Sequence, residues 1–212
     1  MAGSVVSVAQ QKGGAGKTTL AIQLGIAWHR MGKRVLLLDI DPQGSLSAWS
    51  EIRRAQLGEE GALPEVRALS GWRLGTELAT AREAADHVLI DCPPHAETDT
   101  KNAIRLADLT LLPVQPNVLD LWPTRPTLEL AEANQGKALL VLNRVPARGK
   151  VADAIRDQIR ANKWPLAKAS LGNRQAFQAS IGEGRGVAES AASSPAGREI
   201  EALAKEIHRR LR

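Results

Sequence analysis

The sequence predicts an α/β fold: a doubly wound, mostly parallel sheet with helices on both faces, formed as one domain over residues 1–212. Three observations lead to this prediction. Continuous apolar runs such as 34–39 end in acidic residues, which is typical of parallel strands buried on both faces. Segments with helical spacing, such as 17–31, alternate with these runs. A glycine-rich loop at 10–19 lies between the first strand, 4–9, and the first helix.

The composition limits the kind of protein this can be. The 212 residues suffice for a core that buries roughly 70% of the unfolded chain's surface. Cys92 is the only cysteine, so no internal disulfide can form, and a reducing, cytoplasmic compartment is expected. The chain opens directly on a strand pattern, and no apolar stretch approaches the ~20 residues that span a bilayer. We therefore expect neither a signal peptide nor a membrane-spanning helix.

The net charge of +5 is unevenly distributed along the chain. Residues 1–142 carry 14 Lys and Arg against 16 Asp and Glu, whereas residues 143–212 carry 14 against 7. Basic character confined to the last third favours a surface that faces a polyanion. On charge alone, a solvated basic face without a partner is the alternative.

The loop at 10–19 carries the pattern of a phosphate-binding site. Gly13 and Gly16 to Thr18 fit the spacing G-x-x-G-K-T, which lacks the first glycine of the usual G-x-x-x-x-G-K-[ST]. Glycines let backbone N–H groups approach a phosphate chain, and the following helix directs its positive end at the same point. Lys17 can bridge the outer phosphates, while the Thr18 hydroxyl takes a place on Mg²⁺. The nucleotide-binding residues expected in the loop are Gly13, Gly14, Ala15, Gly16, Lys17, Thr18 and Thr19.

Two further sites lie where predicted strands end. Asp39 and Asp41 stand in the sequence Asp-Ile-Asp-Pro-Gln-Gly after the second strand, and Asp91 ends another apolar strand before Cys92 and two prolines. Carboxylates at the C-terminal edge of parallel strands line the ligand crevice. Alternation along an extended chain lets Asp39 and Asp41 reach the same crevice. Asp91 suits a Walker B position, which holds Mg²⁺ directly or through a water.

Lys12 adds a second lysine at the start of the loop. With it, K-G-G-x-G-K-T resembles the deviant Walker A motif of the ParA/MinD superfamily of P-loop NTPases. Residues 39–44 resemble that family's switch I, and residues 91–94 resemble the start of its switch II. The resemblance covers nearly the whole chain and implies a P-loop ATPase fold. It also implies a nucleotide-dependent sandwich dimer, in which Lys12 reaches the ATP bound by the partner.

The resemblance implies catalytic and metal-binding roles as well. Asp41 would orient or activate the attacking water, and Asp39 would support the Mg²⁺ shell. The expected catalytic residues are Lys12, Lys17 and Asp41. The residues expected to hold or support Mg²⁺ are Thr18, Asp39 and Asp91.

Three later residues have two interpretations each. Asn143 ends an apolar strand, and by resemblance it would read the adenine edge, because a neutral amide both donates and accepts hydrogen bonds. The alternative is a polar strand terminus. Asp120 would bond across the dimer or cap a helix. His95 comes after two prolines and is interpreted as a loop histidine in preference to a catalytic base.

The remaining elements complete the sheet and its covering helices. The other expected helices span 45–57, 72–85, 151–161 and a final helix from 194. The other expected strands span 65–69, 87–91, 109–115, 137–142 and, as the last, 166–170. Pro113 is expected to interrupt its strand, and Pro123 and Pro126 to confine helix to the residues after them, because proline removes a donor. The narrow apolar stripe of the final helix favours packing on the sheet over binding to a membrane.

The predicted reaction is hydrolysis of ATP, with Mg²⁺, by in-line attack of water. No DNA-reading domain is expected before the loop, so the chain resembles the short partition ATPases. These bind nonspecific DNA as ATP dimers, and a centromere-binding partner stimulates hydrolysis. A cytoplasmic, nucleoid-associated homodimer that segregates plasmid or chromosomal DNA is therefore expected. The candidate DNA contacts are Arg148, Lys150, Arg174 and Arg185.

Other functions stay open at this point. A related ATPase positions a protein cargo, such as a chemotaxis cluster or microcompartment, through an adaptor protein. Another cycles on a membrane as MinD does, and a nucleotide-binding scaffold without turnover is the non-enzymatic alternative. Nitrogenase-like reductases are excluded because they need several cluster-ligating cysteines. Bacterial tyrosine kinases of related fold are excluded because the chain has no tyrosine.

Overall fold

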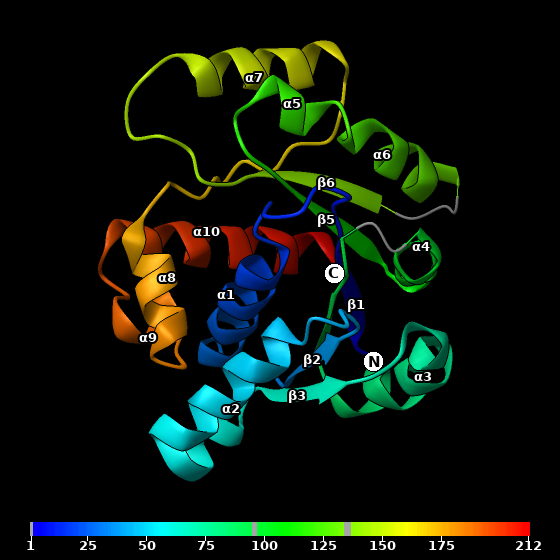
Figure 1. Cartoon of the computed structure of the whole chain (residues 1–212), viewed down its shortest axis with the longest axis vertical. Helices are drawn as coiled ribbons and strands as arrows, with labels where there is room; N and C mark the ends of the chain where they lie inside the picture. The colour runs from blue at the N-terminus through cyan, green and yellow to red at the C-terminus, as the bar shows by residue number, and fades with distance from the viewer. Residues whose placement is uncertain (1, 95–96, 134–136) are drawn as a thin grey trace.

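Six strands form one sheet in the order β3-β2-β4-β1-β5-β6 (Figure 1). The computed structural model describes residues 2–94, 97–133 and 137–212, so His95 lies outside the described residues. The strands are β1 Ser4–Val8, β2 Val35–Asp39, β3 Glu65–Ala68, β4 His87–Asp91, β5 Leu109–Val114 and β6 Lys137–Leu142. Neighbouring strands all pair in parallel, which confirms the predicted fold class.

Helices connect the strands and cover the sheet. They are α1 Lys17–Arg30, α2 Ser45–Leu57, α3 Leu74–Ala84, α4 Glu97–Leu106, α5 Val118–Leu121, α6 Thr124–Ala133, α7 Val151–Ala161, α8 Gln175–Gly182, α9 Val187–Ser190 and α10 Pro195–Arg210. The short 3₁₀ helices η1 Gly58–Ala62 and η2 Gly71–Arg73 flank β3. Sequence signals fix several ends. Gly32 stops α1 with a φ of 74°, and the Ser194 side chain caps α10 by accepting the N–H of Gly197.

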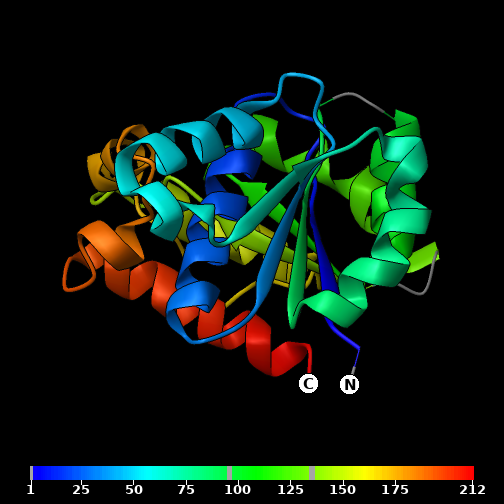
Figure 2. The ribbon, with the colours of Figure 1, turned by 90° about the horizontal axis from the view of Figure 1, so that it is seen from below.

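Two apolar cores lie on opposite faces of the sheet. Helices cover both faces (Figure 2). Successive strand residues point to opposite faces, so Leu37 of β2 enters one core while Leu36 and Leu38 enter the other. The first core is shared with α1, α2, α8, α9 and α10, and the second with α3, α4, α6 and α7. Helices on both faces explain why the strands read as continuous apolar runs.

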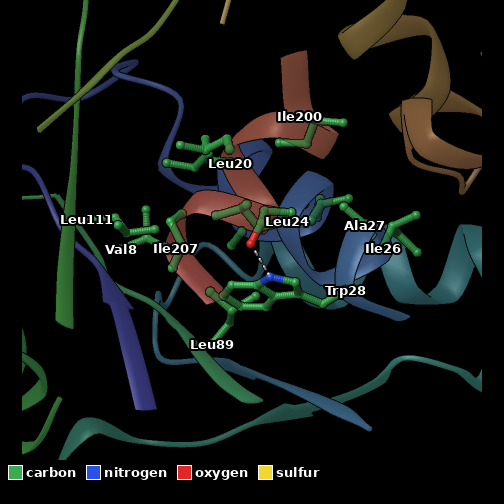
Figure 3. Close-up of a cluster of buried hydrophobic side chains, with 14 of the residues drawn as sticks. Val8, Leu20, Leu24, Ile26, Ala27, Trp28, Leu89, Leu111, Ile200 and Ile207 are labelled. Atoms are coloured by element: carbon green, nitrogen blue, oxygen red, sulfur yellow. Dashed lines mark hydrogen bonds between the residues drawn. The ribbon is translucent and has the colours of Figure 1, made fainter. Parts of the chain in front are cut away.

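Trp28 fixes α10 against α1 (Figure 3). Its indole is fully buried, and its Nε1 donates to the carbonyl of Ala204 at 3.0 Å. Ile200, Leu203 and Ile207 of α10 are buried in the same core. The apolar stripe of the final helix is therefore used in packing, as the sequence predicted.

The predictions about prolines are wrong. β5 continues through Pro113, which stands in register with Val141 of β6. The helix α5 forms before Pro123, and α6 begins before Pro126. Pro126 lies in the first turn of α6, where a backbone N–H has no partner within the helix, so proline costs little there.

The predicted last strand over 166–170 does not form. Leu166 makes only an isolated bridge to Leu140. The N–H groups of Lys168 and Ala169 donate instead to the carboxylate of Glu206, at 3.0 to 3.1 Å. The segment also lacks β-branched and aromatic side chains, which favour strands.

The C-terminal ends of β1, β4 and β2 meet at one edge of the sheet. Val8 pairs in register with Asp91, and Asp91 with Asp39. From β1 the chain first builds the sheet toward β3 and later continues on the other side with β5 and β6. Such a switch point is where open α/β sheets bind ligands. Among the described residues, no helix has the length and apolar character needed to cross a bilayer.

Candidate functional site

The loop between β1 and α1 has the backbone shape of an anion cradle. Gly14 and Gly16 take left-handed φ angles of 74° and 92°, which glycine adopts without strain. A Cβ at Gly13 or Gly14 would meet no heavy atom within 4 Å, so the loop is open there. At Gly16 a Cβ would lie 2.5 Å from Nδ2 of Asn143, so this position needs glycine for space as well. Open space beside the loop at the N-terminal end of a long helix fits a phosphate chain.

Lys17 and Thr18 begin α1 directly after this loop. Lys17 is only 6% exposed, and burial lowers the pKa of its ammonium, while the nearby charges of Asp91 and Asp41 raise it. The sequence-predicted lysine and carboxylates are therefore brought together at one edge of the sheet. A cation placed beside a phosphate cradle neutralises the charge of a bound phosphate chain.

Asp91 gives the strongest indication of a metal site. It is fully buried, and neither carboxylate oxygen has a hydrogen-bond partner among the described residues. Burial raises the pKa of Asp91 to about 7, although the Thr18 hydroxyl nearby and the Lys17 ammonium oppose this shift. A buried, unpaired carboxylate is costly unless a cation compensates it.

The donors present fit Mg²⁺ better than a metal held wholly by protein. In the parts of the chain that the structure describes, no group of three or more His, Cys, Asp or Glu side chains could hold a metal ion. Mg²⁺ takes one or two protein oxygens and completes its shell with phosphate oxygens and water. Asp91 and Thr18 offer such a pair of oxygens.

Asp39 and Asp41 order the segment after β2. The Oδ2 atom of Asp39 accepts hydrogen bonds from the Ser47 N–H at 2.9 Å and the Ser47 hydroxyl at 2.7 Å. Its Oδ1 accepts the N–H of Asp41 at 3.2 Å, and Asp41 in turn accepts the N–H of Gln43 at 2.9 Å. Asp39 is 2% exposed and anchors the start of α2, whereas Asp41 is half-buried.

Lys12 forms an ion pair with Asp120 of α5. The Asp120 side chain is 3% exposed and that of Lys12 is 41% exposed. Asn117 caps α5, since its side chain accepts the N–H of Leu119 at 2.9 Å. The prediction that Asp120 caps a helix is therefore wrong, and a bond from Asp120 across a dimer stays a prediction.

Two amides that contact the phosphate loop come from the ends of β5 and β6. Asn143, which is 6% exposed, donates from Nδ2 to the carbonyl of Ala15 at 2.9 Å. Gln115 donates from Nε2 to the carbonyl of Gly14 at 3.1 Å. Sequence reasoning missed Gln115. Its position at the end of a predicted strand, on the edge that carries Asn143, is the signal that could have found it.

The four candidate DNA contacts lie on different elements. Arg148 and Lys150 are exposed on the segment between β6 and α7, and neither has an ion-pair partner among the described residues. Arg185 is half-buried between α8 and α9. Arg174 donates to the carboxylate of Glu199 from Nε and a terminal nitrogen, at 2.5 to 3.0 Å. The charge of Arg174 is thus already compensated within the protein.

Comparisons with known proteins agree with this geometry. The family model described as the CobQ/CobB/MinD/ParA nucleotide binding domain matches residues 6–187. The chain is 30% identical over 211 residues to maintenance of carboxysome distribution protein A of Halothiobacillus neapolitanus, covering 95% of each chain. It is 31% identical over 242 residues to the chromosome-partitioning ATPase Soj of Thermus thermophilus, covering 97% of this chain and 96% of that one.

A solved structure has the same fold. The septum site-determining protein MinD of Pyrococcus horikoshii, determined with Mg-ADP, superposes with a TM-score of 0.78. The superposition covers 96% of this chain and 95% of the other at 22% sequence identity. At this identity the likeness establishes the arrangement of sheet and helices, and the relatives in sequence bear on the chemistry.

Proposed function

Because the chain belongs to the CobQ/CobB/MinD/ParA nucleotide-binding family, whose ParA and MinD members are ATPases, we propose that it hydrolyses ATP to position a cargo. In this proposal, ATP joins two subunits into a dimer that binds nonspecific DNA, and a partner protein stimulates hydrolysis. The observation that supports it most is the buried, unpaired Asp91, placed near Lys17 at the open phosphate loop.

The proposed reaction depends on holding the water and the phosphates in position and on neutralising the charge of the phosphates. Thr18 and Asp91 would hold Mg²⁺, with Asp39 in support, and the ion neutralises charge on the phosphates. Lys17 binds the outer phosphates at the positive end of α1. Asp41 accepts a hydrogen bond from the attacking water and orients it in line with the bond that breaks.

The surface around α5 supports a dimer. Lys12 lies at the surface in its pair with Asp120. Leu119 and Trp122, next to that pair in the sequence, are 62% and 63% exposed. Exposed apolar side chains beside a functional site indicate a surface that contacts another protein. In the dimer, Lys12 leaves Asp120 and reaches the phosphates bound by the partner.

The charge distribution supports DNA as the surface on which the dimer is retained. The last 70 residues carry the excess of basic side chains, and Arg148 and Lys150 are exposed. The Thermus relative is named as a chromosome-partitioning ATPase, which supports a DNA cargo. We propose a nucleoid-associated protein on these grounds.

A protein cargo is the second candidate function. The match to the relative named for carboxysome distribution covers 95% of both chains, close to the 97% and 96% covered by the match to the partitioning ATPase. The proposed ATP hydrolysis is the same for a DNA cargo and for a protein cargo, and the adaptor protein differs. A membrane-cycling role has no such support, since the apolar stripe of α10 is buried against the sheet.

Two variants and one control test the reaction. Lys17→Ala should weaken Mg-ATP binding at least about 100-fold, because it removes the cation that faces the phosphates. Asp41→Ala should keep ATP affinity within about threefold and lower phosphate release at least about 100-fold, because the attacking water loses its partner while the phosphate loop and Lys17 stay in place. Asp157→Ala, at an exposed site on α7, should change neither. Normal turnover by Asp41→Ala would remove Asp41 from the proposed role.

A second experiment tests the proposed cycle. Retention on a DNA-coated surface is measured with Mg-ATP, with Mg-ADP and without nucleotide. We expect retention only with ATP, and a dimer in sedimentation under the same conditions. Equal retention in all three states would contradict ATP-controlled DNA binding, and a monomer with a non-hydrolysable analogue would contradict the dimer.

A further inference from the structure

Two side-chain amides hold consecutive peptide units of the phosphate loop. Gln115 donates to the carbonyl of Gly14 at 3.1 Å, and Asn143 donates to the carbonyl of Ala15 at 2.9 Å. The amides come from the C-terminal ends of β5 and β6, which stand side by side in the sheet. The reaction outlined above does not use either contact.

The geometry of the peptide bond gives these contacts a consequence. In a planar trans peptide unit the C=O and the N–H point in opposite directions. The carbonyl of Gly14 shares its unit with the N–H of Ala15, and the carbonyl of Ala15 shares its unit with the N–H of Gly16. A carbonyl turned toward an amide at the strand ends therefore turns the next N–H in the opposite direction, away from the strand ends.

Asn143 is itself held in one orientation. Its Oδ1 accepts the backbone N–H of Arg144 at 2.9 Å, which directs Nδ2 toward the loop. Arg144 has a φ of 53°, a left-handed conformation that side chains other than glycine rarely adopt. Strained backbone of this kind persists where the surrounding structure requires it. Gly16 leaves the space that the Asn143 amide occupies.

We propose that Gln115 and Asn143 are positioning residues, which aim the N–H groups of Ala15 and Gly16 at the triphosphate before it binds. Backbone N–H groups that point inward are the part of such a loop that recognises phosphate. A preformed cradle binds better than one that must order itself, since less freedom is lost on binding. The effect acts on the phosphates and is independent of the base, which distinguishes it from adenine reading by Asn143.

Uncharged variants test the proposal without placing new charge beside a phosphate. Gln115→Met and Asn143→Ala each remove the N–H donor, and Gln178→Met is the matched control at an exposed site on α8. Dissociation constants are measured by calorimetry for Mg-ATP, Mg-GTP and magnesium with inorganic triphosphate. We expect each variant to weaken all three ligands by a similar factor of about five to ten, the size of one lost hydrogen bond. The control should match the wild type.

Amide signals provide a readout that does not depend on the ligand. In the nucleotide-free protein, the amide NMR signal of Ala15 should shift in Gln115→Met, and that of Gly16 should shift in Asn143→Ala. In each variant the carbonyl of the same peptide unit loses its hydrogen-bond donor. Unshifted signals would overturn the proposal. Weakening confined to ATP in Asn143→Ala would assign that residue to the base. Gln115 is half-exposed, so Gln115→Met tests the proposal even where Asn143→Ala lowers stability.

The inference rests on the proposed function, which takes this loop as the triphosphate site. Lys17→Ala separates the two possible failures. If Lys17→Ala binds inorganic triphosphate as tightly as the wild type, the loop is not the site and the proposed function fails. If Lys17→Ala loses binding while Gln115→Met and Asn143→Ala keep wild-type affinities, the positioning role alone fails.

Discussion

At the scale of single residues, the ion pair between Lys12 and Asp120 decides where the Lys12 ammonium lies in an isolated subunit. Asp120 is buried, and its second carboxylate oxygen has no partner among the described residues, so it holds the lysine as its compensating charge. A lysine that must reach another subunit's phosphates has to leave this partner first. In the dimer proposed above, the pair would therefore oppose association until ATP offers a stronger anion.

Asp120→Asn should strengthen the ATP-bound dimer. The variant removes the charge that retains Lys12 in its own subunit, and we expect the dimer dissociation constant to fall about fivefold, which corresponds to about 1 kcal/mol. Sedimentation velocity with Mg²⁺ and a non-hydrolysable ATP analogue measures it. Asp153→Asn, an exposed acid on α7, should leave the dimer unchanged. A weaker dimer in Asp120→Asn would show that Asp120 itself bonds across the interface.

Residue-scale predictions from sequence succeed where the residue lies next to a motif. Asp39, Asp41 and Asp91 could be placed at one edge because each comes after a recognisable strand pattern. The partner of Lys12 could not be found, since Asp120 is 108 positions away and no local pattern pairs them. The contact between Gln115 and the phosphate loop spans 101 positions and was missed for the same reason.

At the scale of elements, Arg53 ties α2 to the segment around α9. The arginine is 3% exposed and donates to both carboxylate oxygens of Glu189 at 2.8 and 2.9 Å. It also donates to the carbonyls of Leu63 and Gly184, both at 2.9 Å. Asp39 holds the first turn of α2 through Ser47, and this clamp holds a later turn, so the helix that follows residues 39–44 is fixed at two points.

Arg53→Met should destabilise the fold by roughly 3–5 kcal/mol, because it leaves the nearly buried carboxylate of Glu189 without its cation. The double variant with Glu189→Met should recover part of this loss, since no unpaired charge remains. Urea unfolding measures both. Arg160→Met breaks an exposed pair with Asp157 and should cost less than about 1 kcal/mol. Equal losses of unfolding free energy in Arg53→Met and Arg160→Met would contradict a buried clamp.

His87 of β4 and His208 of α10 form a second link between elements. Their ring nitrogens Nε2 and Nδ1 lie 2.9 Å apart, and the Trp28 ring lies 4.3 Å from that of His87. Burial, together with the charges of His208 and Lys33, lowers the pKa of His87 to about 4, although the charge of Asp86 opposes this shift. The neutral form of His87 is therefore the one that the fold accepts.

The stability that depends on neutral His87 should be present above pH 6.5 and lost as the pH falls toward 4. Over that window the unfolded chain binds a proton and the folded chain does not, so the free energy of unfolding falls by up to roughly 3 kcal/mol. Urea midpoints at several pH values measure it. His87→Gln should flatten the dependence, and His29→Gln, at a half-exposed site, should flatten it less. An unchanged slope in His87→Gln would contradict this assignment.

Element-scale predictions from sequence depend on how a segment's backbone hydrogen bonds are satisfied. β2 and β4 were predictable because apolar runs ended by Asp fit a strand covered on both faces. Residues 166–170 also follow a helix in the chain, where a strand is expected. The Glu206 carboxylate nevertheless accepts two of their N–H groups. A carboxylate on a distant helix can thus replace a strand partner, and the local sequence does not contain that information.

At the scale of the whole molecule, basic side chains are concentrated in the last third of the chain. They differ in how available they are to bind an anion. Arg148 and Lys150 are exposed and unpaired among the described residues, whereas Arg174 is held by Glu199. A side chain already paired inside the protein gains less from a DNA phosphate, because it must first give up its partner. Formal charge alone therefore overstates how much of this basic surface is available to bind a polyanion such as the proposed DNA.

The salt dependence of DNA binding tests this distinction. Arg148→Ala and Lys150→Ala should each reduce the slope of log affinity against log salt by about 1, because each removes a phosphate contact that releases a counterion. Arg174→Ala should leave the slope unchanged and lower thermal stability, because Glu199 loses its partner. Fluorescence anisotropy with a random-sequence duplex, Mg²⁺ and an ATP analogue measures the slopes between about 50 and 200 mM salt. If Arg174→Ala alone lowers the slope, the DNA lies over α8 and α10, and the loop between β6 and α7 is not the contact.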